Sequence, residues 1–286
     1  MAESLAHSFG QIIGSVLEDA ILPDLEKFAG THGLYLDKKG PRKARKGRKV
    51  SWTDQFGNTH DLDFVLERGG DDETIGTPVA FIETAWRRYT KHSRNKAQEI
   101  QGAIQLLSST HKHSCPFTGI ILAGVFTEGA LTQLRTLGFQ VLHFSYESII
   151  NAFKSVGVDA AFDEGTEEAE FRRKIEKWDS LDPRSKARVR WHLLRSNKAQ
   201  LQRFLRQLER SITRRVDRVV ILPLYGHESE HASVAAAIQH LRAFTPNSDK
   251  APLRWFEIRV KYSNGDHIDG QFETKESAIE FLEKFT

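Results

Sequence analysis

Apolar residues recur along the chain with two periods, which predict helices and strands in turn. Residues 3–28 carry Leu5, Phe9, Ile12 and Val16 three or four positions apart, as on one face of a helix. Pro23 is expected to divide that helix into two pieces. Further helices are predicted at 94–109, with Ser93 as N-cap, and at 128–137 and 146–156. Short apolar or alternating runs predict strands at 33–36, 50–52, 61–66, 78–85, 118–125 and 140–144.

The order of these elements predicts an α/β fold. The run at 118–125 is almost uninterrupted in its apolar character, which is typical of a central strand covered on both faces. Strands that alternate with helices indicate parallel crossovers, whereas 50–52 and 61–66 are expected to pair as a hairpin. We therefore expect a first domain at 1–165 with a mixed sheet flanked by helices.

The remainder, 166–286, is expected to form a second domain. Residues 167–215 are helical in pattern and rich in arginine, which suits DNA recognition or dimerisation. A small α+β layer is predicted to follow, with strands at 216–224, 253–262 and 267–273 and helices at 229–244 and 275–285. The Asn264-Gly265 pair predicts a tight turn between the last two strands.

Composition narrows the class of protein. The chain has 286 residues, of which 39% are hydrophobic and 28% charged, an ordinary balance for a globular protein with a real core. No apolar run approaches the roughly 20 residues that a membrane span needs. The single cysteine, Cys115, excludes an internal disulfide framework. We expect a cytoplasmic protein without a membrane partner.

The net charge of +3 is small, but the positive charge is concentrated. The segment 38–49 holds eight cationic residues and no acid: Lys38, Lys39, Arg42, Lys43, Arg45, Lys46, Arg48 and Lys49. Such a run is either a solvated loop or a surface for a polyanion. Its position between two predicted strands favours the second interpretation.

Acids and further cations follow in the next predicted strands. Asp61 and Asp63 alternate with apolar residues, and Glu83 follows an apolar strand. Burying a carboxylate is costly unless something compensates, and a divalent cation such as Mg²⁺ accepts such oxygen ligands. The basic residues that come next are Arg87, Arg88, Lys91, Arg94 and Lys96.

An acid in one hairpin strand, a second acid about twenty residues later and a helix that covers the sheet together resemble the PD-(D/E)xK nuclease superfamily, which has the restriction endonuclease fold. The resemblance covers roughly residues 33–160. It implies that Asp63, favoured over Asp61, and Glu83 bind Mg²⁺. A lysine two residues after the glutamate would act on the attacking water, but this chain has Ala85 there.

Several explanations of the missing lysine stay open. Lys91 or Lys96 takes its place from the following helix, position 85 has been changed from a lysine, or the chain is an inactive relative that only binds DNA. Glu99, one turn into the helix, is a further candidate for a metal or water contact, or a surface acid paired with Lys96.

The resemblance implies a magnesium-dependent endonuclease similar to a type II restriction enzyme. Its substrate would be double-stranded DNA, held by the cations of 38–49 and by Arg87, Arg88 and Arg94 through phosphate contacts. Cutting both strands calls for two active sites, so a homodimer is expected. The alternatives are a catalytically inactive DNA-binding or defence module, and a repair or RNA nuclease with the same core.

Overall fold

The computed structural model describes residues 4–114, 116–224, 226–245 and 254–286. The chain divides into two compact units, Met1–Leu208 and Glu209–Thr286. The sequence placed the boundary near 165 instead. The difference arises because the helices that follow 165 pack on the first unit: buried Phe171 lies 5.1 Å from Phe162 and 6.3 Å from Phe9, measured between ring centroids.

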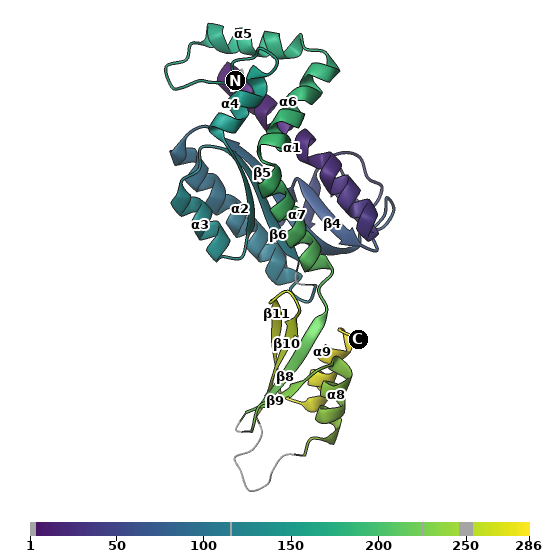
Figure 1. Ribbon diagram of the computed structural model, residues 1–286. Helices are drawn as coiled ribbons and strands as arrows, with labels where there is room; N and C mark the ends of the chain where they lie inside the picture. Colours follow the sequence, from purple (N-terminus) through teal and green to yellow (C-terminus); the bar gives the residue numbers. More distant parts are fainter. Residues whose placement is uncertain (1–3, 115, 225, 246–253) are drawn as a thin grey trace. The chain divides into compact units, whose positions relative to one another are not determined.

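A five-stranded mixed sheet forms the centre of the first unit (Figure 1). Its order is β1-β4-β5-β6-β7, in which β4 pairs antiparallel with β1 and with β5, while β5, β6 and β7 are parallel to one another. The strands are β1 Leu34–Lys38, β4 Phe64–Arg68, β5 Thr77–Arg87, β6 Phe117–Gly124 and β7 Gln140–Ser145. A separate hairpin pairs β2 Val50–Thr53 with β3 Thr59–Leu62. The predicted α/β class and the mixed sheet with flanking helices are confirmed.

Helices cover both faces of this sheet. The first helices are α1 Leu5–His32, α2 Thr90–Thr110, α3 Glu128–Thr136 and α4 Tyr146–Lys154. On one face, Ile100 and Ile104 of α2 share an apolar cluster with Phe81 and Ala85 of β5. The neighbouring residue Trp86 points to the other face and approaches Gly10 of α1. The pleat of β5 therefore presents alternate side chains to α2 and to α1.

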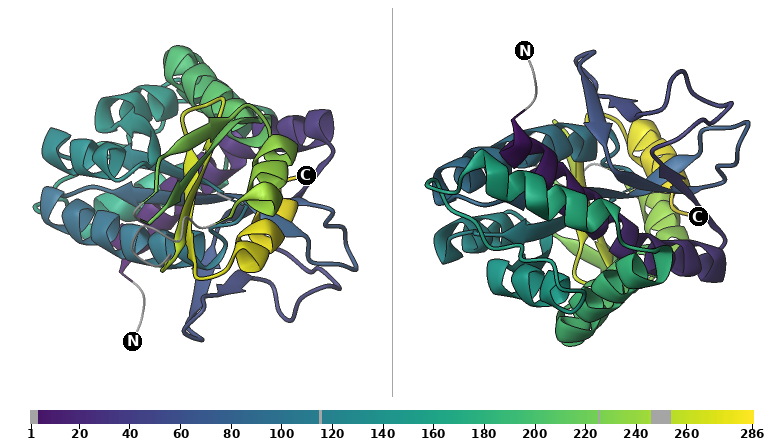
Figure 2. Two further views of the ribbon diagram at one scale, coloured as in Figure 1. Left: turned by 90° about the horizontal axis from the view of Figure 1, so that it is seen from below. Right: turned by 90° about the horizontal axis from the view of Figure 1, so that it is seen from above.

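The first helix is continuous, so the predicted division at Pro23 is wrong. Proline removes one backbone donor from the helix, yet Ile21 and Leu25 on either side of it are completely buried. Their burial holds both halves in one line. α1 packs against β1 and β5 and also against α5 Glu168–Asp179 and α6 Pro183–Ser196 (Figure 2, right).

The second helix begins at Thr90, with Tyr89 as its N-cap, so the predicted cap at Ser93 is wrong. Ser93 is buried inside the first turn, where its hydroxyl donates to the carbonyl of Thr90 at 2.8 Å. The earlier start puts Lys91 as well as Lys96 on the helix.

The second unit is a four-stranded antiparallel sheet of order β11-β10-β8-β9 with two helices packed on it. Its elements are β8 Val216–Pro223, β9 Ser229–His231, α8 Val234–Ala243, β10 Phe256–Tyr262, β11 His267–Phe272 and α9 Lys275–Glu283, preceded by α7 Lys198–Ile212 across the boundary. Helix was predicted from Ser229, but Ser229–His231 pairs with β8 and the helix begins after its cap, Ser233. Residue 253 of the predicted strand lies outside the described residues. In the described part of the chain, no helix has the length and apolarity to span a membrane.

Candidate functional site

Asp63 lies where the chain passes from β3 into β4. The sequence predicted it within a hairpin strand, but the β2–β3 pairing ends at Leu62 and Asp63 is a bend. Thr84 of β5 fixes its carboxylate, since the Thr84 backbone N–H and hydroxyl donate to Asp63 Oδ2 at 2.7 and 2.6 Å. The two hydrogen bonds hold Asp63 beside the residue that follows Glu83.

Glu83 lies within β5, between Phe81 and Ala85, which both belong to the apolar cluster under α2. Its side chain is 14% exposed, and among the described residues its Oε2 is buried without a hydrogen-bond partner. Burial, and then the nearby charge of Asp63, raise the pKa of Glu83 to about 8. An under-satisfied carboxylate next to a second acid is typical of a site completed by a cation.

Lys96 is the cation that the structure brings to Glu83. Its Nζ lies 3.7 Å from Glu83 Oε1 and 2.7 Å from Glu99 Oε1, and its side chain is 15% exposed. Lys91 is exposed, and no ion pair joins it to an acid among the described residues. Glu99 is 68% exposed and contacts Lys96 rather than Glu83. Ala85, at the position where the resemblance calls for lysine, is packed in the apolar cluster.

Glu18 of α1 is an acid at this site that the sequence reasoning missed. Burial and then the charge of Asp63 raise the pKa of Glu18 to about 7, while Lys39 lowers it. A signal was present in the sequence. Glu18 is in helical phase with Ile21 and Leu25, three and seven residues later, which are completely buried. An acid on the buried stripe of a helix needs a partner or a function.

A cavity of about 1060 Å³ opens within the first unit. Asp63 and Glu83 do not line it, but Thr84, which donates to Asp63, and Lys96, which pairs with Glu83, do. The cavity runs between α1, the end of β5 and residues 162–166. Its lining includes Glu18, Lys39, Thr84, Arg87, Arg88 and Lys96. The cavity therefore carries several cations close to the Asp63–Glu83 pair, with room for a phosphodiester group.

The two arginines at the end of β5 are half-buried in the cavity wall. Arg88 donates from Nε to the carbonyl of Phe162 at 2.6 Å, and its guanidinium lies 4.1 Å from the ring centroid of Tyr146. Arg87 donates from Nη1 to the carbonyl of Trp86 at 2.7 Å. Arg94, in contrast, is exposed on α2 and does not line the cavity.

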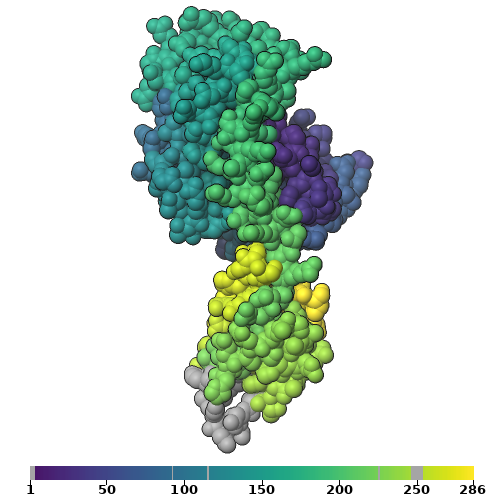
Figure 3. Space-filling view, in the orientation of Figure 1, coloured from purple at the N-terminus to yellow at the C-terminus, as the bar shows by residue number. Residues whose placement is uncertain are grey.

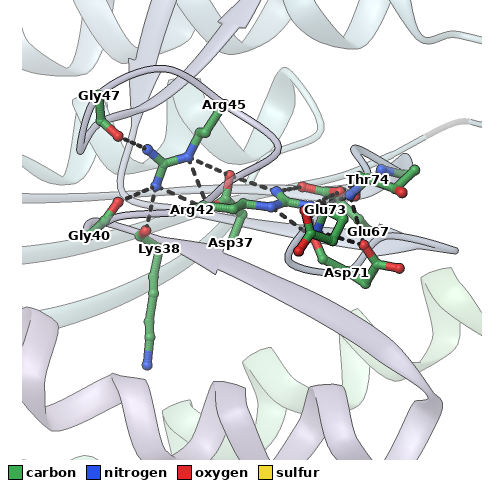
Figure 4. A network of polar contacts seen from close by, with 11 residues as sticks. Asp37, Lys38, Gly40, Arg42, Arg45, Gly47, Glu67, Asp71, Glu73 and Thr74 are labelled. Carbon is green, nitrogen blue, oxygen red and sulfur yellow. Dashed lines mark hydrogen bonds and ion pairs between the residues drawn. The ribbon is translucent and has the colours of Figure 1, made fainter.

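The basic segment 38–49 divides into inward and outward residues (Figure 4). Arg42 is 1% exposed and pairs with Glu67 at 2.6 Å and Asp37 at 2.9 Å. It also donates to the carbonyls of Asp71 and Thr74 at 2.8 Å. Arg45 pairs with Asp37 at 3.1 Å. Both were expected to contact DNA, but here they join the loop to the sheet and do not face solvent.

The six cations that remain, five lysines and Arg48, are directed outward to different degrees. Lys38 pairs with Glu26, Lys43 with Glu73 at 2.5 Å and Lys49 with Asp61 at 2.6 Å. Lys39, Lys46 and Arg48 are exposed. Only Lys39 of the eight lines the cavity.

Asp63 and Glu83 are the residues that could hold a metal ion. Within the described ranges, no group of three or more His, Cys, Asp or Glu side chains is arranged to bind one. The pair fits Mg²⁺ nonetheless, because this ion commonly uses one or two carboxylates together with water and phosphate oxygens. The unpartnered Glu83 Oε2 is the atom that such an ion would satisfy.

Comparison with known proteins gives little further information. No family model matches the chain, and no curated protein matches it. A solved structure titled "Crystal Structure of Protein of Unknown Function AF1548" aligns over 69% of this chain and 94% of its own, with 12% identity and a TM-score of 0.29. A score of this size leaves function to be argued from the chain's own residues.

Proposed function

We propose that this protein is a magnesium-dependent DNA endonuclease whose first unit is a restriction-endonuclease-like catalytic core. Lys96 replaces the lysine that is missing at Ala85. The observation that carries the proposal is the 3.7 Å separation between Lys96 Nζ and Glu83 Oε1. This short distance shows that α2, the helix that follows β5, brings a cation to Glu83.

The electrostatics of the acid pair support a metal ion. The pKa of Glu83 is raised to about 8, first by burial and then by Asp63, so ionising both acids without a cation is unfavourable. Lys96 offsets part of this cost but also pairs with Glu99. A divalent ion would offset more of it and satisfy Glu83 Oε2.

Each residue has a distinct role in the proposed hydrolysis. When bound, Mg²⁺ would polarise the scissile phosphate and lower the pKa of a bound water. Thr84 fixes the Asp63 carboxylate through two hydrogen bonds. Lys96 stabilises the negative charge that develops on the phosphate, and Lys39 at the cavity wall holds the DNA backbone.

The exposed cations bind phosphates of the DNA duplex on either side of the cleavage site. Lys46 and Arg48 are exposed near Lys39 in sequence, and Arg94 is exposed on α2. Contacts from such residues to phosphates position DNA without reading its sequence. Cleavage of both strands would require two copies of the site, and we propose a homodimer for that reason.

Plasmid cleavage with Mg²⁺ tests the proposal directly. Wild-type protein should linearise or nick the plasmid, and Asp63→Asn and Glu83→Gln should each lower the rate by at least about 10³-fold. Asp61→Asn is the matched control, because this acid is two residues from Asp63 but pairs with Lys49 on the surface. Tight DNA binding without cutting under Mg²⁺, Mn²⁺ or Co²⁺ would contradict the enzyme and favour the inactive binding module.

Metal binding is tested separately by thermal unfolding. Mg²⁺ that binds the folded state should raise the melting temperature in a concentration-dependent way. The rise should be lost in Glu83→Gln and kept in Asp61→Asn. An equal rise in all three proteins would show that the ion acts elsewhere. Parallel assays on duplex DNA and RNA distinguish the proposed substrate from that of an RNA nuclease.

A further inference from the structure

One surface of the first unit has features that the proposed catalytic site does not use. Helix α6 carries Arg184, Arg188, Trp191 and Arg195 at spacings of four, three and four residues. Such spacings place the four side chains on one face of the helix. We call this the α6 stripe. Space-filling atoms of α6 and α7 form the green column at the surface beside the purple α1 (Figure 3).

The stripe exposes a large aromatic ring to solvent. Trp191 is 50% exposed, one of few large hydrophobic side chains so placed in the described part of the chain. The guanidinium of Arg195 lies 4.7 Å from its ring centroid. Val189 and Leu193, two residues before and two residues after Trp191, are buried and anchor α6 on the first unit. Trp191 is therefore held on a fixed helix without being part of the core.

The charge of the stripe is positive and uncompensated. Arg184, Arg188 and Arg195 are exposed, and among the described residues no ion pair joins them to a carboxylate. The acid at this end of the helix is Asp182, whose Oδ1 accepts hydrogen bonds from the backbone N–H groups of Arg184 and Ser185. Asp182 thus serves as the N-cap of α6 and does not pair with the arginine side chains. Their guanidinium groups are therefore available to bind an external anion.

We propose that the α6 stripe binds single-stranded nucleic acid, with a base stacked on Trp191 and the arginines on the flanking phosphates. Proteins that hold single strands combine a cationic track with an aromatic platform, as this helix does. The stripe from Arg184 to Arg195 is about 16 Å long at the helical rise per residue, enough for a few nucleotides. A membrane surface would require a wider apolar face than one tryptophan.

The stripe is linked to the candidate site through α1. Arg190 on the flank of α6 lies 3.5 Å from Asp19, which is next to Glu18. The inference rests on the proposed function in one respect, because it assigns unpaired segments, such as flaps or ends, to the substrate. Binding without metal nevertheless tests it apart from any cleavage.

The experiment measures binding of a fluorescein-labelled dT15 strand to the full chain in EDTA by anisotropy. Trp191→Ala should weaken binding roughly tenfold and Trp191→Phe should largely restore it, because the phenyl ring keeps a stacking face. Arg188→Gln should weaken binding and reduce the slope of log K against log salt by about 0.7, the contribution of one single-strand phosphate contact.

The matched control is Arg173→Gln on α5, which removes an exposed charge outside the stripe. It should change binding much less than Arg188→Gln does. Equal losses from the two variants, or wild-type binding by Trp191→Ala, would overturn the inference. So would tighter binding of a dT15·dA15 duplex than of the single strand, or full competition by a poly-glutamate peptide at equal charge.

The outcomes separate the inference from the proposed function. Binding of dT15 that depends on Trp191, in a protein that never cuts DNA, would support the stripe and contradict the endonuclease. Cleavage that requires Asp63 and Glu83, with dT15 binding insensitive to Trp191, would support the endonuclease and contradict binding by the α6 stripe. An oligo-U15 strand shows whether the stripe accepts RNA as well.

Discussion

Two clusters of acids lie in or next to the same sheet, and their carboxylates have partners to different extents. Asp37 and Glu67 are 2% and 0% exposed and share the guanidinium of Arg42, and Asp37 also pairs with Arg45. Glu83 pairs with Lys96, which also contacts Glu99, while the Asp63 carboxylate accepts two hydrogen bonds from Thr84. The guanidinium of Arg42 has a fixed, forked geometry that suits carboxylates. In the second cluster, Glu83 Oε2 has no hydrogen-bond partner among the described residues, and Thr84 and Lys96 line the cavity.

The difference separates a structural network from a candidate chemical site. Arg42 donates to two carboxylates and to two backbone carbonyls, so its charge and its donors are used within the fold. Glu83 instead has a pKa raised to about 8, because burial and Asp63 oppose its ionisation. A cluster kept in this state is expected where a ligand completes it.

Removing Arg42 should have the largest effect on stability. Arg42→Met removes the cation that pairs with buried Glu67 and leaves Asp37 paired with Arg45, so it should lower the free energy of unfolding by about 3–5 kcal/mol. Urea unfolding measures the change. Lys43→Met is the control, since that pair is 70% and 64% exposed and should contribute less than about 1 kcal/mol. Equal midpoints for the two variants would show that the network is not structural.

Removing Lys96 should affect catalysis rather than folding. Lys96→Ala should lower the rate of the proposed cleavage by about 10²–10³-fold, because it withdraws the charge that we propose stabilises the transition state. Lys91→Ala should leave the rate unchanged. If neither variant slows cleavage while Ala85→Lys raises it by orders of magnitude, the displaced-lysine assignment is wrong and the protein is a disabled nuclease.

Neutralising Glu83 should stabilise the protein at high pH in the absence of metal. The folded pKa of about 8 lies above the ordinary 4.5, so ionised Glu83 disfavours the folded state as pH rises from 4.5 to 8. Glu83→Gln should therefore unfold with a free energy roughly 3 kcal/mol higher than wild type near pH 8, and the gain should shrink toward pH 4.5. Urea unfolding across pH measures it.

The control for that series is Glu128→Gln, whose side chain is 79% exposed. Its effect on the free energy of unfolding should be small and nearly constant with pH. A pH-independent gain in Glu83→Gln would contradict the electrostatic origin of the difference between the two clusters.

Glu18 should show the same behaviour more weakly. Its pKa is raised to about 7, so the gain from Glu18→Gln should develop between pH 4.5 and 7 and reach roughly 1–2 kcal/mol. Asp19→Asn, with a side chain that is 60% exposed, is the adjacent control. A destabilising effect of Glu18→Gln at pH 8 would show that ionised Glu18 stabilises the fold, as Asp37 and Glu67 do through Arg42.

The sequence by itself determined the class of fold and most of its elements. Apolar periodicity located the strands of the mixed sheet and the helices around it, because one face of each element must be buried. It also marked Asp63 and Glu83, since acids within apolar strands are unusual. The helix break predicted at Pro23 and the N-cap predicted at Ser93 were wrong. In both places the local preference of the residue was overridden by burial of the surrounding helix.

Only the tertiary structure decided which charges meet. Lys91 and Lys96 are both lysines of α2. The position of Lys96 on the helix brings its side chain to Glu83, whereas Lys91 is exposed. Arg42 and Arg45 belong to a basic run, yet they point inward because Asp37 and Glu67 come from β1 and β4, which pair side by side. The charge of Asp63 raises the pKa of Glu18, although the two residues are more than forty positions apart in the sequence. Charge pairing depends on distances of a few ångströms between distant segments, and sequence order does not determine those distances.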